Sequence, residues 1–576
     1  MAQTVDERAA GWTDPQVVHL DPRRWIALAI VLSAGFMVLL DTSIVNVAIP
    51  SIRNNLGASY AEIQWVLAGY TLAYALLLIT GGRLGDLFGR KRLFIIGMAG
   101  FTVGSALCGL APSSNVLVAS RVIQGVMAAL MFPQALSVIQ VSFPPQERGA
   151  ALGIFGAIVG LATIMGPLAG GLIIGSNTTG GAWRYVFLVN VPIGVISILA
   201  AAWLMRESRA PQASRLDPVG VVIASLGLFM LVFPLVEGRD ADWAPWTYIS
   251  MASSAAVLTG FVLYELGISR RGQSPLVQLR MFRDRAFSVG SMIAVVFFAG
   301  LPAFAFTFSL MLQAGLGFTA LHAGLTFVPF SIGTALGSAV SIRLAPWLGK
   351  GILLLGSALL SAGMLSIIGI LHAAGGGVTS LQLAPALLAS GLGLGSVIAP
   401  LTNIILAGVR GTDAGSASGV LTTVMQVGGA FGVAVMGVIF FNLIGTGADR
   451  AAAEVAPSLR ASLVAAQPGA PTSRIDAEVG TFTHCYGELA RAKDPNATPP
   501  GCAAPAGGSR GPVGSALGTA FIGARATTFT DSEIRSLFMP VGLFGLTFLL
   551  VLLLPQAKRL SHELREAAGN WLGAPG

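Results

Sequence analysis

The chain has 576 residues, of which 54% are hydrophobic and 10% charged, and its mean hydropathy is +0.76. Because soluble domains carry about 25% charged residues, this composition excludes one large soluble domain and indicates an all-α protein that crosses a membrane many times. The net charge of +8 comes from basic residues dispersed over short connections, so no nucleic-acid partner is indicated.

Apolar stretches long enough to span a bilayer occur fourteen times along the chain. They lie near residues 25–49, 62–81, 93–111, 115–139, 149–175, 185–205, 217–236, 246–268, 287–313, 322–342, 351–372, 382–407, 418–444 and 537–555. Lys and Arg gather in every second short connection, which predicts an even number of spans and cytoplasmic termini. Residues 1–24 and 556–576 are then cytoplasmic tails, and the polar start is no cleavable signal peptide.

Asp41 lies inside the first predicted span. The apolar run before it, Trp25–Leu40, is too short to cross a bilayer, so we expect the helix to continue through Asp41 to about Ile49. A carboxylate inside a span costs about 2.5–3.5 kcal/mol or more, which makes Asp41 a candidate functional residue. The alternative is an Asp that caps a kinked or broken helix.

The second predicted span ends in the sequence GRLGDLFGRKR, residues Gly82–Arg92. Glycines here permit a tight turn, and the basic residues hold the connection at the cytoplasmic face. Such a charged cluster can latch one conformation. The alternative is that the same residues only fix the orientation of the protein in the membrane. The candidate latch residues are Gly82, Asp86, Gly89, Arg90, Lys91 and Arg92.

Arg121 lies within the fourth predicted span, at about the depth of Asp41. A guanidinium inside a membrane needs a partner, so we expect Arg121 to contact Asp41 directly or through water. The pair can act as a proton switch if the contact forms in only one conformation; the alternative is a static structural pair. Gln124 lies on the same helical face as Arg121.

The fifth predicted span contains GPLAGG, whose candidate residues are Gly166, Pro167, Gly170 and Gly171. Small residues spaced along one helix let two backbones touch, and proline bends the helix. We therefore expect a close-packed pivot in this span.

The chain also repeats itself, because RLGDLFGRK at Arg83–Lys91 resembles RLAPWLGKG at Arg343–Gly351. Internal repeats are typical of transporters whose site lies between two halves. We predict two six-helix bundles, 25–205 and 286–555, and an inserted pair of spans within 206–285. Pro346 stands where Asp86 stands in the first copy, so a latch of this kind is one-sided.

Residues 445–536 form a long connection that falls on the outer side. It holds Cys485 and Cys502, which an oxidising compartment can join, and with only two cysteines a disulfide and two free thiols stay equally open. Cys108 lies within the third span, and we expect its side chain to pack against neighbouring helices without a chemical role.

Five of these segments resemble the signatures of one family. They are LDTSIVNVAIP (Leu40–Pro50), GRLGDLFGRKR, RVIQG (Arg121–Gly125), GPLAGG and WRYVFLVNVPIG (Trp183–Gly194). In this order they resemble the major facilitator superfamily, and with two extra central spans its 14-span drug:H⁺ antiporter branch. The resemblance implies two bundles around a cavity that opens alternately to each side, and export of drugs in exchange for protons.

The resemblance assigns roles to the matching residues. Asp41 is the titrating acid, Arg121 couples proton and substrate, Asp86 and Arg90 belong to the latch, and Gly166–Pro167 to the antiporter motif. The chain departs from the pattern at Ala162, where a glycine is usual. Some relatives carry further acids in the second half, but the last six predicted spans contain no Asp or Glu well inside. His322 is an alternative titrating group near the outer face.

A single deep carboxylate favours neutral or monocationic amphiphiles as substrates. The predicted cavity combines adaptable apolar walls with a few amides. Its candidate lining residues are Trp65, Tyr70, Gln124, Phe132, Gln134, Phe306, Met311, Gln313, Phe327, Asn403, Met425 and Gln426.

The sequence predicts a proton-coupled multidrug exporter of the cell membrane, active in antibiotic resistance. The alternatives are a dedicated exporter of one natural product and a membrane sensor on the same scaffold. No phosphate-binding G-x-x-x-x-G-K-[ST] segment and no catalytic cluster is visible, so we expect neither an ATP-driven pump nor an enzyme. We expect no cofactor or metal, a proton gradient as the energy source, and a monomer whose partners are substrate, protons and lipid.

Overall fold

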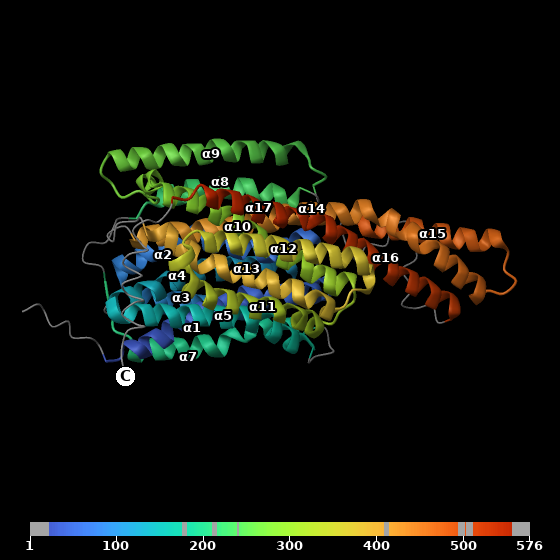
Figure 1. Cartoon of the computed structure of the whole chain (residues 1–576), viewed down its shortest axis with the longest axis horizontal. Helices are drawn as coiled ribbons and strands as arrows, with labels where there is room; N and C mark the ends of the chain where they lie inside the picture. Colours follow the sequence, from blue (N-terminus) through green and yellow to red (C-terminus); the bar gives the residue numbers. More distant parts are fainter. Residues whose placement is uncertain are drawn as a thin grey trace, which may run out of the picture.

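The computed structural model describes residues 22–143, 145–175, 181–209, 216–238, 241–407, 414–492, 502 and 511–555. The regular structure of these residues is helical, and most of the helices run along one long axis (Figure 1). Thirteen described segments are long and apolar enough to cross a membrane, and a further helix of 31 residues, α5, completes the first bundle. The expected all-α membrane fold is confirmed.

The N-terminal bundle contains the segments that carry most of the predicted site. Its helices are α1 (Arg24–Leu56), α2 (Tyr60–Phe88), α3 (Arg90–Gly109), α4 (Ser114–Ser142), α5 (Pro145–Gly175), α6 (Trp183–Leu188) and α7 (Asn190–Leu204). At the start of α2, the Ser59 hydroxyl accepts from the Glu62 N–H while the Glu62 carboxylate accepts from the Ser59 N–H. This capping box pairs two backbone donors that would otherwise be unsatisfied.

The inserted pair consists of α8 (Pro218–Glu237) and α9 (Pro245–Arg270). Helix α9 packs on α8 and lies at the edge of the bundle (Figure 1). Helix α8 contacts both α2 and α14, so it lies along a seam between the two halves. The Trp65 indole N–H donates to the Glu237 carboxylate over 2.7 Å, and the Trp65 ring packs beside Phe229 and Phe233.

The C-terminal bundle is built around a cluster of phenylalanines. Its helices are α10 (Arg285–Leu310), α11 (Ala320–Leu348), α12 (Gly351–Ala374), α13 (Ser380–Ala407), α14 (Ala414–Ala466), α16 (Pro512–Ser536) and α17 (Phe538–Leu552), with short turns η1 (Leu279–Arg283), η2 (Met311–Gly315) and η3 (Gly375–Gly377). Phe304 contacts Phe308, Phe327 and Phe330 through ring pairs with centroids 5.0–6.4 Å apart.

The segment expected as a long connection, 445–536, folds into helices. Helix α14 has 53 residues and is therefore about 80 Å long, more than twice the thickness of a bilayer core. Its far part packs with α15 (Thr472–Arg491) and the start of α16 as a helical extension (Figure 1). A disulfide joins Cys485 to Cys502 in this extension. We call this side of the molecule the extension end, and the side that carries Arg83–Arg92 the basic end.

The last span begins earlier than residue 537. Helix α17 has 15 residues and is about 22 Å long, too short to cross alone, and only Leu537 separates it from α16. The last turns of α16 therefore belong to the span, although their charged residues lower the local hydropathy. The expectation of no acid inside the second half was wrong, because Glu533 is completely buried there.

Contacts between the two halves are found toward the extension end. The Ser309 hydroxyl donates to the Asn46 carbonyl over 2.7 Å, and the Gln313 amide donates to the Val47 carbonyl over 3.1 Å. The rings of Tyr60 and Phe441, from α2 and α14, have centroids 4.0 Å apart. These contacts hold the two bundles together at this end.

Candidate proton-coupling and transport site

Asp41 lies near the middle of α1 and is completely buried. The helix continues past Pro50 to Leu56, so 15 residues, about 22 Å, follow Asp41 rather than the roughly 10 Å expected from an end at Ile49. Proline at this position does not end the helix. The alternative of an Asp capping a broken helix is therefore wrong, because α1 is continuous on both sides of Asp41.

Arg121 of α4 forms an ion pair with Asp41, and both side chains are buried. The Arg121 Nη1 donates to the Asp41 carboxylate and to the Gln124 Oε1 atom over 2.7 Å, and Nε donates to the Val66 carbonyl over 2.9 Å. The guanidinium carbon also lies 4.1 Å from the centroid of the Tyr70 ring. The buried guanidinium is stabilised here because its Nη1 and Nε donors and its face have partners.

Two side-chain amides also donate hydrogen bonds to Asp41. The Gln124 Nε2 donates to Asp41 Oδ1 over 3.0 Å and to the Ser105 hydroxyl over 2.7 Å. The Asn190 Nδ2 of α7 donates to Asp41 Oδ1 over 3.2 Å. The carboxylate thus receives hydrogen bonds from three side chains on two helices, and these partners compensate for its burial away from water.

Sequence reasoning placed Asp41, Arg121 and Gln124 together but missed Asn190 and Ser105. Both lie in apolar spans, and an amide or hydroxyl in such a run needs a buried partner. That signal was present at Asn190, within VFLVNVPIG.

At the basic end, the predicted latch residues form a compact cluster. Arg90 pairs with Asp86 over 2.7 Å, one turn earlier. The side chain of Glu207, which follows α7, accepts from the Lys91 N–H over 3.0 Å and from the Arg92 N–H over 3.3 Å. A carboxylate at the N-terminus of α3 is favoured by the exposed N–H groups and by the helix dipole. Glu207 was missed because its partners lie over a hundred residues away.

The glycines of this motif allow neighbouring side chains and helix α4 to approach its backbone closely. Gly89 has a φ of +112° between α2 and α3, and a Cβ atom there would lie 2.5 Å from the Glu207 carboxylate. A Cβ atom at Gly85 would overlap the side chain of Gln134, and one at Gly82 would lie 3.6 Å from Pro133. Helices α2 and α4 therefore touch along this face.

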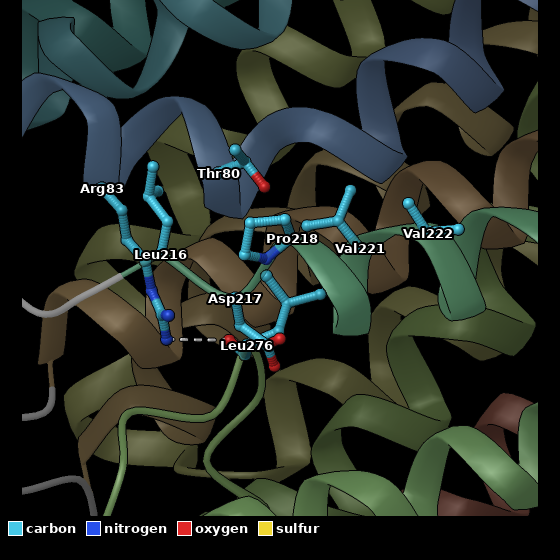
Figure 2. A pocket seen from close by; sticks show the side chains of 8 residues that line it. All are labelled: Thr80, Arg83, Leu216, Asp217, Pro218, Val221, Val222 and Leu276. Carbon is cyan, nitrogen blue, oxygen red and sulfur yellow. Dashed lines mark hydrogen bonds between the residues drawn. The ribbon is translucent and has the colours of Figure 1, made fainter.

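Arg83, in the same motif, connects the first bundle to the inserted pair. Its guanidinium donates to the Pro275 carbonyl and, over 3.1 Å, to the Leu276 carbonyl. Figure 2 shows the second of these contacts. The carboxyl groups of Asp217 and Glu265 lie beside this contact, and Asp217 also accepts from the Tyr264 hydroxyl over 3.0 Å. This polar cluster anchors α8 and α9 to the basic end of α2.

A pocket of about 220 Å³ adjoins this anchor (Figure 2). Its walls are nearly all apolar, and it lies beside the N-terminus of α8 rather than between the two halves. The lining residues are Thr80, Arg83, Leu216, Asp217, Pro218, Val221, Val222 and Leu276. None of the predicted cavity residues is among them.

The glycines of α5 bring two helices onto its surface. A Cβ atom at Gly166 would overlap the Ser43 hydroxyl of α1, and one at Gly170 would lie 3.0 Å from the Ile44 side chain. A Cβ atom at Gly171 would lie 2.8 Å from the backbone of Leu321, on α11 of the other half. Helix α5, with Pro167 inside it, is thus close-packed against both bundles, as a pivot requires.

Several predicted cavity residues make packing contacts in the described conformation. Trp65 contacts α8, Gln134 donates to the Gly81 carbonyl of α2, and Tyr70 lies under Arg121. Phe132 packs edge-on against Tyr74. Phe306, Met311 and Phe327 are buried in the second bundle, and Gln313 binds α1. These are packing contacts in the described conformation, and a cavity role for these residues also stays a prediction. Asn403 is exposed, and Met425 and Gln426 are half-buried, so for them a cavity role stays a prediction.

The arrangement defines a membrane transporter, and comparison with known proteins gives its family. The family described as Major Facilitator Superfamily matches residues 31–433. The chain therefore belongs to the major facilitator superfamily, a family of transporters and not of enzymes. The fold resembles that of a bacterial homologue of the human lysosomal transporter Spinster, with a TM-score of 0.56, 16% identity, and coverage of 93% of this chain and 98% of that one.

Several curated relatives are named for the transport of one compound or for drug resistance. The "Probable actinorhodin transporter" of Streptomyces coelicolor is 40% identical, over 93% of this chain and 93% of that protein. The tetracenomycin C resistance and export protein of Streptomyces glaucescens is 32% identical, over 77% and 81% of the two chains. The multidrug resistance protein Stp of Mycobacterium tuberculosis is 32% identical, over 70% and 73%.

Proposed function

We propose that this protein exports antibiotics or related amphiphilic molecules across the cytoplasmic membrane in exchange for protons. The observation that carries the proposal is the buried ion pair of Asp41 and Arg121, held by Gln124 and Asn190. A carboxylate that is charged in one conformation and protonated in another couples proton movement to the rearrangement of the helices around it. The energy source is the proton gradient, without a cofactor, and the working unit is a monomer.

Alternating access would use the two ends of the molecule differently. In the proposed orientation the basic end faces the cytoplasm, where Asp86, Arg90 and Glu207 connect α2, α3 and the end of α7. The extension end faces outward. The contacts between the halves there would separate in the outward-open state, with α5 sliding on α1 and α11.

A dedicated exporter of one natural product is the second candidate. It is favoured by relatives that are named for single compounds, actinorhodin and tetracenomycin C, at 40% and 32% identity. The name of Stp, multidrug resistance protein, favours a broad range instead. Resistance profiles of a host that expresses the protein, across unrelated antibiotics, would separate the two candidates.

The first prediction concerns Asp41→Asn. Asparagine keeps the shape of the side chain but has no charge to titrate, so we expect the variant to reach the membrane while its ΔpH-driven export is lost. The measurement is accumulation of the probe ethidium, and of an antibiotic chosen from the resistance profile, in everted vesicles with an imposed pH gradient. Asp476→Asn in the exposed extension is the control and should transport normally. Undiminished ΔpH-driven transport by Asp41→Asn would contradict the proposal.

A further inference from the structure

Glu533, near the end of α16, is a second buried acid that the Asp41 network does not use. Its side chain is completely buried. Its Oε1 atom accepts a hydrogen bond from the Thr307 hydroxyl of α10 over 3.3 Å, and its Oε2 atom has no hydrogen-bond partner among the described residues. Thr530, one turn earlier on the same helix, also has a buried hydroxyl oxygen without a partner in this part of the structure. An unpartnered polar atom of this kind needs an explanation.

The helices that pack on α16 bring no charge to Glu533. Phe529 of α16 packs on Phe440 of α14, and the part of α14 from 414 to 448 contains no titratable residue. Neither η2, η3 nor α17 contains a charged or titratable side chain. On α10 the charged residue is Arg285, at the opposite end of the helix and about 33 Å along it from Thr307.

The remaining charged groups are also remote or turned away. His372 is exposed at the end of α12, and Lys350 binds the Leu552 carbonyl at the other end of the bundle. On α16 itself, Arg525 lies two turns, about 12 Å, toward the extension end. Asp531 and Arg535 are each two residues from Glu533 and therefore point to other faces of the helix.

These surroundings fit a neutral carboxylic acid and not a carboxylate. An ionised group in a buried site with one hydroxyl partner and no cation costs several kcal/mol by the general rule for buried unpaired charges. A neutral acid with one unpaired oxygen costs much less. The surroundings of Asp41 differ, because the cationic Arg121 and the neutral amides of Gln124 and Asn190 all donate hydrogen bonds to it.

The two acids lie at similar depth on opposite sides of the interface between the halves. Ser309, two residues after Thr307, donates to the carbonyl of Asn46, which is five residues after Asp41. These offsets correspond to about 3 Å along α10 and about 7.5 Å along α1. Glu533 is therefore close to the level of Asp41, but it belongs to the C-terminal half.

We propose that Glu533 is a second proton-binding site of this transporter, which holds a proton in the described conformation. The proton is bound as Glu–COO⁻ + H⁺ ⇌ Glu–COOH, and it leaves when α16 separates from α10 and water reaches the carboxyl group. The role in transport rests on the proposed function, whereas proton binding by Glu533 is testable without any substrate.

The test is infrared difference spectroscopy of the full-length protein in liposomes, between acidic and alkaline buffer. We expect the wild type to show the C=O stretching band of a protonated carboxylic acid that disappears as the pH rises. Glu533→Gln should lose this band, whereas Asp531→Asn, on the same helix but not completely buried, should keep it. A spectrum of Glu533→Gln identical to the wild type would overturn the proposal, as would a band that does not respond to pH.

A second variant keeps the test decisive if Glu533→Gln does not fold. Glu533→Asp retains a carboxyl group one methylene shorter, so the band should move rather than vanish, and an unmoved band would overturn the assignment to Glu533. The two proposals also fail separately. If export in the vesicle assay does not depend on ΔpH while the infrared band is present, the proposal of proton-coupled export is wrong and proton binding by Glu533 stands. If the band is absent while export depends on Asp41, only the proposal for Glu533 is wrong.

Discussion

At the scale of single residues, the site depends on matching a buried charge with enough donors. Asp41 and Arg121 are both fully buried, and their pairing is supported by Gln124, Asn190 and the Val66 carbonyl. A buried pair with incomplete partners would destabilise the fold, because each ion has lost its water. The network therefore serves stability in the charged state and, in the proposed mechanism, switching when Asp41 takes up a proton.

Arg121→Lys tests whether charge alone is enough. Lysine keeps the positive charge but lacks the planar fork that reaches Asp41, Gln124 and the Val66 carbonyl together. Loss of even one hydrogen bond to a charged group costs about 1.5–3 kcal/mol, so we expect ΔpH-driven export to fall roughly tenfold or more. Arg121→Ala should be worse still. The measurement is the initial rate in everted vesicles, and a Lys variant with the wild-type rate would show that the fork is dispensable.

At the scale of elements, glycines set how closely the helices approach. Gly166 and Gly170 let α5 touch α1, Gly171 lets it touch α11, and Gly89 provides the turn between α2 and α3. In a membrane, small residues are the usual means of close helix contact, since burial of apolar groups gives little gain between lipid and protein.

Gly166→Ala should separate α1 from α5. The new methyl group would overlap the Ser43 hydroxyl and approach the Ile44 backbone, so we expect a stability loss of about 1–3 kcal/mol and slower transport. Gly175→Ala, on the same helix, is the control, because its Cβ atom would lie 3.5 Å from the Leu321 side chain, an ordinary contact. Thermal unfolding of the purified protein distinguishes the two, and equal midpoints would contradict the proposed pivot.

Gly89→Ala should disturb the latch at the basic end. A non-glycine residue at a φ of +112° costs roughly 1–3 kcal/mol, and the added carbon would displace the Glu207 carboxylate from the N-terminus of α3. The control is Gly267→Ala in α9, where a Cβ atom meets open space and alanine favours the helix. We expect a lower unfolding temperature for the first variant only, and a decrease in both would mean that the turn is not the cause.

At the scale of the whole molecule, the two halves are joined where α5 packs on α11 and α2 packs on α14, and α8 lies along the second of these seams. Ser309, Gln313 and the ring pair of Tyr60 and Phe441 connect the bundles where the extension begins. If transport proceeds by alternating access, these contacts must separate once in each cycle.

Cross-linking can test this movement directly. Tyr60→Cys/Phe441→Cys places two new thiols between the halves, while Cys108 is buried and the other cysteines are already paired. A short bifunctional thiol reagent should join the halves and stop export. The pair Tyr486→Cys/Phe521→Cys, whose rings are 5.6 Å apart within the extension, is the control and should cross-link without loss of transport. Full transport by the first cross-linked variant would contradict separation at this end.

The sequence by itself determined the class of protein, the fold and the central ion pair. A span needs about 20 apolar residues, so hydropathy finds most helices, and a charge inside a span needs a partner, so Asp41 and Arg121 could be paired by depth alone. The ordered motifs identified the superfamily, which the match over residues 31–433 confirms. The glycine spacing of α5 also predicted its close contacts, because backbone approach depends on the absence of a side chain.

Only the tertiary structure decided which distant side chains complete each site. Asn190, Ser105 and Glu207 join their networks across large sequence separations, and a one-dimensional pattern does not contain such contacts. The folded extension and the early start of the last span were missed because average hydropathy falls wherever charged residues occur, even when Glu533 is buried. Burial depends on what the neighbouring helices cover, and that is a property of their packing in three dimensions.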